Sequence, residues 1–217
     1  MSDIWFSVNE YKDLVNLNVK FIKGELSQTP YHLGPLDSET LPLVEKLIKM
    51  HARGILTLEG QPGICEYKQF IPHTWIQNGQ IEGNWYVDCE QKSYISFCVQ
   101  KTNESLKFIR KILTSKELVV FALDISNNKV FSNTKGEFNV TRERSHSELD
   151  KLESTQWTLF TNIHELHSSD IIRIWNDYPQ IQKILKKCFH VYVALKEYGV
   201  SGIEDKIMSI YSEFQNM

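Results

Sequence analysis

The residues with the clearest chemical potential lie close together in the stretch HARGILTLEGQPG, at residues 51–63. Here the chain carries an imidazole at His51, a hydroxyl at Thr57, a carboxylate at Glu59 and an amide at Gln61. A carboxylate and an amide can hold a polar ligand, and an imidazole, whose pKa lies near neutrality, can act as a general base. We therefore expect a polar ligand-binding site in this stretch.

The turn at residues 61–63 is the second part of the expected site. Its sequence is Gln-Pro-Gly, with proline and then Gly63 at the central positions, as a type II turn requires. Strand alternation would put Thr57 and Glu59 on one face, leading to the strand end where open α/β sheets bind ligands. The simpler alternative is that the turn only reverses the chain, Glu59 is solvated and His51 packs at the edge of the core.

Two short motifs support this choice of positions. The first is formed by Leu47, Gly54, Leu56, Thr57, Gln61, Pro62 and Gly63. The second is EQKSY at residues 90–94, which includes Lys92. Both motifs resemble an uncharacterised bacterial domain family of unknown function, with a leucine-rich helix end, a Gly-Phe-Leu-Thr-like strand and a Ser-Gln-Pro-Gly turn. The resemblance implies no activity and only points to these positions. If the strand and turn are functional, we expect Lys92 or His51 to reach the site from elsewhere in the fold.

Two departures from the family pattern limit what the resemblance implies. Gly60 stands where the family has serine before Gln-Pro-Gly, so any role of that hydroxyl is absent here. Lys92 stands where the family has arginine.

An enzymatic alternative stays open. Cys65 lies just after the turn and is the best placed of the four cysteines to act as a nucleophile with a nearby base. No recognisable nucleophile motif surrounds it. A small hydrolase or transferase would use His51, Glu59 or Cys65.

Metal ions and cofactors are not expected. His164 and His167 are spaced i, i+3, whereas the thermolysin-like zinc pattern needs i, i+4 with a glutamate between them. The four cysteines lack C-x-x-C spacing, and no glycine-rich phosphate loop of the Walker type occurs.

Composition narrows the class of protein. The chain has 217 residues, 41% hydrophobic and 24% charged, which is typical of a globular domain. A formal net charge of −3 makes nucleic acid an unlikely partner. No run of about 20 apolar residues or signal-like N-terminus occurs, so we expect no membrane contact. Scattered cysteines favour reduced thiols and a cytoplasmic protein.

Hydrophobic periodicity and capping residues predict the elements that position these groups. Helices are expected from Ser7 to Gly24, from Asp37 or Ser38 to Gly54, and over 103–113, 169–175, 177–199 and 201–214. Strands are expected over 55–59, 85–87, 93–99, 118–123 and 157–163, with a loop or hairpin excursion over 126–156. The apolar run at 118–123 is typical of a strand buried on both faces.

These elements predict a single globular domain, residues 1–217, of the α+β or α/β class. Its centre would be a mixed sheet with helices from both termini packed on it. The best functional interpretation is a non-catalytic or ligand-binding domain whose partner is a polar small molecule or a protein. A third interpretation is an interaction module that binds through exposed Trp75, Trp85 and Tyr86.

Overall fold

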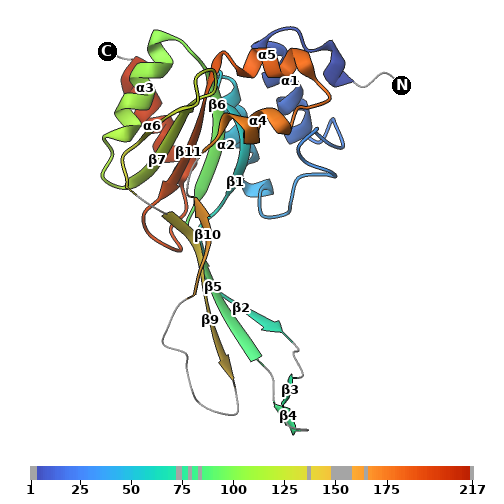
Figure 1. Cartoon of the computed structure of the whole chain (residues 1–217), viewed down its shortest axis with the longest axis vertical. Helices are drawn as coiled ribbons and strands as arrows, with labels where there is room; N and C mark the ends of the chain where they lie inside the picture. Colours follow the sequence, from blue (N-terminus) through green and yellow to red (C-terminus); the bar gives the residue numbers. More distant parts are fainter. Residues whose placement is uncertain are drawn as a thin grey trace.

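The centre of the protein is a five-stranded sheet with the strand order β1-β6-β11-β7-β8 (Figure 1). Its strands are β1 (Leu56–Gln61), β6 (Tyr94–Gln100), β11 (Cys188–Leu195), β7 (Leu118–Asp124) and β8 (Lys129–Ser132). The structure, a computed structural model, describes residues 4–71, 75–77, 80–82, 85–135, 138–147, 158–163 and 166–215. With helices on both faces of the sheet, the fold is α+β, as the sequence predicted.

Strand pairing corrects the expectation of a mixed sheet, while the α+β class holds. Each strand pair among the described residues is antiparallel. The predicted strand at 118–123 is interior, as β7 between β11 and β8. All six of its apolar residues are buried, as expected of a strand covered on both faces.

The central strand β11 corrects one sequence prediction. The long helix expected over 177–199 ends early: α5 covers only Pro179–Leu185, and Cys188–Leu195 is a strand. All eight strand residues are buried. A strand with neighbours on both sides and helices on both faces has no polar face, so its apolar run has no period that distinguishes it from a buried helix.

Helices cover the two faces of this sheet from both ends of the chain. One face packs against α2 (Val44–His51), α3 (Asn103–Leu113) and α6 (Ile203–Gln215). The other packs against α1 (Tyr11–Ile22), α4 (Ser168–Arg173) and α5. None of the described helices is long and apolar enough to cross a membrane.

Two helix starts differ from the sequence prediction. Ser7 ends a short 3-10 turn, Ile4–Ser7, and its hydroxyl donates to the Ile4 carbonyl. The cap of α1 is formed one turn later, where Asp13 Oδ2 accepts the backbone N–H of Glu10 at 3.1 Å. Another 3-10 turn, Leu41–Leu43, precedes α2, so that helix also starts later than expected.

A second, four-stranded sheet extends away from the body of the protein (Figure 1). Its order is β10 (Thr158–Ile163), β9 (Phe138–Ser147), β5 (Trp85–Gln91) and β2 (Ile64–Ile71). Near its tip β3 (Trp75–Gln77) pairs with β4 (Gln80–Glu82). The structure does not describe the side chains of Trp75, Trp85 and Tyr86, so their proposed role in binding stays a prediction.

Candidate functional site

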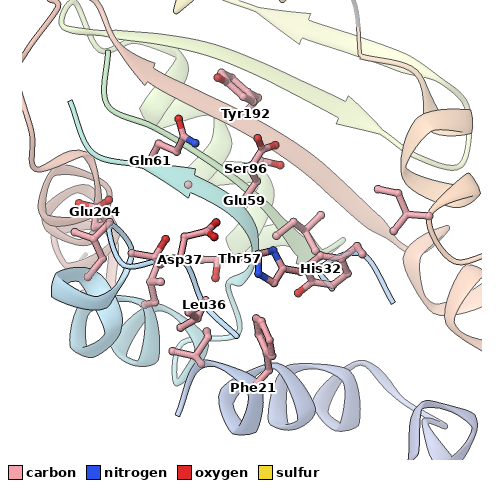
Figure 2. Close-up of a pocket in the computed structure, with 18 of the residues that line it drawn as sticks. Phe21, His32, Leu36, Asp37, Thr57, Glu59, Gln61, Ser96, Tyr192 and Glu204 are labelled. Atoms are coloured by element: carbon pink, nitrogen blue, oxygen red, sulfur yellow. The ribbon is translucent and has the colours of Figure 1, made fainter. Parts of the chain in front are cut away.

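A hollow of about 660 Å³ lies along β1, the edge strand of the main sheet (Figure 2). It is lined by the end of α1, the segment 31–43, β1, parts of β6 and β11, α4 with Trp175, and the first turn of α6. This volume falls within the roughly 300–1,000 Å³ that small-molecule sites commonly enclose. Thr57, Glu59 and Gln61 all line it.

A β-bulge at Leu58 sets the directions of these side chains. Thr57 pairs with Phe97, and Glu59 pairs with the next residue of β6, Ser96, so Leu58 is an additional residue in β1. Paired residues of antiparallel strands project on the same face. Thr57 and Glu59 therefore lie on opposite faces, contrary to the alternation assumed from the sequence. Both reach the hollow because it spans the edge of the strand.

Glu59 belongs to a small polar and aromatic group. Tyr94 Oη donates to Glu59 Oε1 at 2.9 Å, and the Tyr94 ring stacks on Tyr192 with ring centroids 5.3 Å apart. Burial, followed by the charge of Glu59, raises the pKa of the Tyr94 hydroxyl. Tyr94 therefore stays protonated and acts as a hydrogen-bond donor to the carboxylate.

The lining of the hollow is acidic. Four carboxyl groups line it, and none of its described lining residues is a lysine or an arginine. The four are Asp37, Glu39, Glu59 and Glu204. Glu39 also accepts from Gln61 Nε2 at 3.4 Å, which places it beside the Glu59 end of the strand. A site of this charge attracts cations and disfavours anions.

The floor of the hollow contains a buried serine–histidine pair. Ser96 Oγ lies 2.7 Å from His190 Nε2, and His190 Nδ1 has no hydrogen-bond partner among the described residues. His190 is only 5% exposed, and burial lowers its pKa to about 4. The imidazole is therefore neutral at pH 7 and adds no positive charge to the site.

Glu204 is the most buried of the four acids, with 1% of its surface exposed. Neither carboxyl oxygen has a hydrogen-bond partner among the described residues. Burial raises the pKa of this carboxyl. Its own backbone N–H and the charge of Lys46 act in the opposite direction but do not outweigh burial, so the ionised form is destabilising at the wall of the site.

His51 does not reach this hollow. It lines a second hollow of about 380 Å³, between α1, the end of α2 and the start of α3. His51 is 2% exposed, its Nδ1 lies 2.8 Å from the Leu47 carbonyl, and burial lowers its pKa to about 4. The structure thus places His51 as a packed histidine, in a different hollow from Glu59.

Lys92 also lies elsewhere, at the junction with the second sheet. Its Nζ is 4.1 Å from the ring centroid of Phe138 and 4.3 Å from that of Tyr198. Arg142 lies over the same Tyr198 ring, at 4.2 Å, and donates from Nε to Glu90 Oε2 at 2.6 Å. Lys92 is 8% exposed, and burial, then the charge of Arg142, lowers its pKa. These contacts connect β9 to the loop after β11.

Gly63 contacts a loop and does not line the hollow. A Cβ at this position would lie 2.2 Å from the Val200 carbonyl oxygen, so only glycine allows this approach. Ser201 Oγ donates to the Gly63 carbonyl at 3.2 Å; this contact replaces the helix cap that the sequence predicted for Ser201. The Pro62 carbonyl accepts from Gln91 Nε2 at 3.1 Å. Gly63 lacks the positive φ of a type II turn, so that prediction is wrong: residues 61–63 lead the chain from β1 of the main sheet into β2 of the second sheet.

The remaining candidates form no further site within the part of the chain that the structure describes. Cys89, Cys98 and Cys188 are free thiols, while the side chain of Cys65 lies outside the described residues. His164 is also outside them, which leaves its pairing with His167 untested. Among the residues that the structure describes, no group of three or more His, Cys, Asp or Glu side chains could hold a metal ion.

Sequence reasoning missed most of the hollow's lining. Asp37 was seen only as a helix cap, and Tyr192 and His190 belong to the strand that was predicted as a helix. Glu204 was likewise interpreted only as part of a cap. An available signal was the run CFHVYVAL at residues 188–195, whose β-branched and aromatic residues favour a strand.

The chain matches the family described as "Domain of unknown function (DUF6919)" over residues 1–176, and it belongs to that family. This agrees with the resemblance to an uncharacterised domain family. Among curated proteins it is 26% identical over 159 residues to "Methylenetetrahydrofolate reductase 2" of Saccharomyces cerevisiae. The matched region is 73% of this chain but only 23% of the yeast protein.

Proposed function

We propose that this protein is a ligand-binding domain whose hollow beside β1 holds a positively charged group attached to an apolar or aromatic body. The observation that carries the proposal is the lining: four carboxyl groups, no lysine or arginine among the described lining residues, and several aromatic rings. The charged group would lie at the Glu59 end, beside Tyr192.

Both parts of that end favour a cation. A carboxylate forms charge-assisted hydrogen bonds with an ammonium or guanidinium group, and each is worth more than a neutral hydrogen bond. The π-face of a tyrosine attracts the same charge through its quadrupole. Glu59 is held in place by the 2.9 Å bond from Tyr94, so less conformational entropy would be lost on binding.

The proposed role is binding without catalysis. His51 and Glu59 line separate hollows, so the pair considered for acid–base chemistry does not converge. The chain spans only 23% of the yeast protein that it matches. The reductase activity in that printed name is not carried over to this chain.

A matched series of three fragments tests the proposal. 4-Phenylbutylamine, 4-phenylbutanol and 4-phenylbutyrate share one body and differ in a cationic, neutral or anionic head. We expect the amine to raise the melting temperature of the protein in a concentration-dependent way, because a ligand that binds only the folded state stabilises it. The butyrate should have no effect. Equal shifts with all three, or a preference for the acid, would rule out the cation site.

A further inference from the structure

The hollow follows the open edge of β1. Five consecutive residues of this strand, 57 to 61, line it. Because successive side chains of a strand point to opposite faces, a hollow on one face would be lined by every second residue. The bulge at Leu58 alters this alternation at one point only. A continuous lining therefore means that the hollow also exposes the backbone edge.

The two sides of the strand confirm this geometry. In Figure 2 Glu59, Ser96 and Tyr192 lie to one side of the β1 ribbon, and Asp37 and Leu36 lie to the other. The lining accordingly includes residues from the core clusters on both faces of the main sheet. The edge of β1 runs through the middle of the hollow.

The backbone of this edge is free to pair. β1 is the terminal strand of its sheet, hydrogen-bonded to β6 alone. On the paired side of β1 the Tyr11 hydroxyl bridges the two strands: it accepts from the Leu56 N–H at 3.3 Å and donates to the carbonyl of Cys98 in β6 at 2.6 Å. On the other side of the strand, the backbone of residues 57–60 forms no hydrogen bond with any described residue outside β6.

We propose that the ligand of this site is a basic peptide segment in extended conformation, which adds to β1 as a sixth strand of the main sheet. This inference rests on the proposed function and names the class of its ligand. An exposed edge offers main-chain hydrogen bonds to any extended chain, and side-chain sites on the two faces then select the sequence. Five residues at about 3.3 Å each span about 16 Å, the length of β1 that lines the hollow.

Charge selects a basic sequence. Alternate side chains of the added strand project to the two sides of β1. One side offers Glu59 with the Tyr192 ring, and the other offers the exposed Asp37. A lysine or arginine therefore meets a carboxylate on either side, while an acidic residue meets only like charge. Apolar lining from Phe21, Leu36 and Trp175 accepts the residues between them.

Backbone-methylated peptides test the main-chain pairing without altering the protein. The parent is acetyl-Lys-Val-Lys-Val-Lys-amide. One analogue carries N-methyl groups on its lysines and the other on its valines, so charge and side chains are unchanged. In an added strand only one of these two sets of N–H groups faces β1. We expect one analogue to bind about tenfold or more weakly than the parent in isothermal titration calorimetry, and the other to bind like the parent.

The outcomes separate this inference from the proposed function. If both analogues bind like the parent, or if phenylbutylamine binds and no peptide does, strand addition is wrong while the cation site stands. If acetyl-Glu-Val-Glu-Val-Glu-amide binds as well as the lysine peptide, both proposals are wrong. If one analogue alone loses affinity and the acidic peptide does not bind, both are supported.

Discussion

Thr57 and Glu59, two residues apart in β1, lie on opposite faces of the strand because Leu58 is a bulge between them. One bulge thus brings a hydroxyl from one side of the sheet and a carboxylate from the other to the same hollow. A regular strand would have put both side chains on one face and left the other side of the hollow without a contribution from this pair. The bulge is the local feature on which the site depends.

Gly63→Ala tests whether the close contact between Gly63 and Val200 stabilises the fold. The added Cβ would lie 2.2 Å from the Val200 carbonyl oxygen, and backbone cannot move aside cheaply. We expect the free energy of unfolding, measured by urea titration, to fall by about 2 kcal/mol or more. Gly60→Ala is the matched control, because its Cβ would meet nothing closer than 3.4 Å. Equal stability of the two variants would contradict the close contact.

Lys92→Met tests the junction between the sheets. Methionine keeps an apolar stem and removes the charge from between the rings of Phe138 and Tyr198. We expect a loss of about 1 kcal/mol of stability, as for a partly desolvated cation–π contact. Affinity for phenylbutylamine should not change. Lys116→Met, at an exposed position, serves as the control for loss of a positive charge. Weaker ligand binding without a loss of stability would instead place Lys92 in the site.

Much of the fold was accessible from the sequence, and the main exception, β11, has a physical cause. Helices such as α3 have one solvent-exposed face, so the 3.6-residue period of their apolar residues is visible in the sequence. The buried strand β11 has none, and it was predicted as a helix. Because β11 was predicted as a helix, the sequence also did not predict the Ser96–His190 pair or the place of Tyr192 in the hollow. The bulge was invisible because nothing in Leu-Thr-Leu-Glu distinguishes a bulged strand from a regular one.

Acid should destabilise the protein through its two buried histidines. Burial lowers the pKa values of His51 and His190 from 6.5 to about 4. Between these values the unfolded chain binds more protons than the folded one, so stability is complete above pH 6.5 and falls as the pH falls toward 4. The steepest slope is about 1.4 kcal/mol per pH unit for each histidine.

Urea titrations at pH 7, 6 and 5 measure this slope. His190→Gln places a non-titrating amide beside Ser96 in place of the imidazole. The free energy of unfolding should therefore fall less steeply with decreasing pH than in the parent protein. His51→Gln should reduce it similarly. An unchanged slope in both variants would show that these imidazoles are not the groups responsible.

Glu204→Gln should stabilise the protein at pH 7. Burial raises the pKa of this carboxyl by more than its own backbone N–H and the charge of Lys46 lower it, so its ionised form opposes folding. The neutral amide removes that charge, and we expect a gain of about 1 kcal/mol in the free energy of unfolding. The gain should shrink as the pH is lowered and Glu204 itself becomes protonated. A loss of stability at pH 7 would mean that the carboxylate has a stabilising partner.

The most direct test of the cation site is the ratio of the dissociation constants of phenylbutanol and phenylbutylamine, measured by calorimetry in three proteins. In the parent protein we expect the amine to bind about tenfold more tightly, as one charge-assisted contact provides. In Glu59→Gln the two fragments should bind alike, because the carboxylate that distinguishes them is gone. In Glu25→Gln, where an exposed acid outside the hollow is replaced, the preference should persist. A preference for the amine that survives Glu59→Gln unchanged would contradict the assignment of the cation to Glu59.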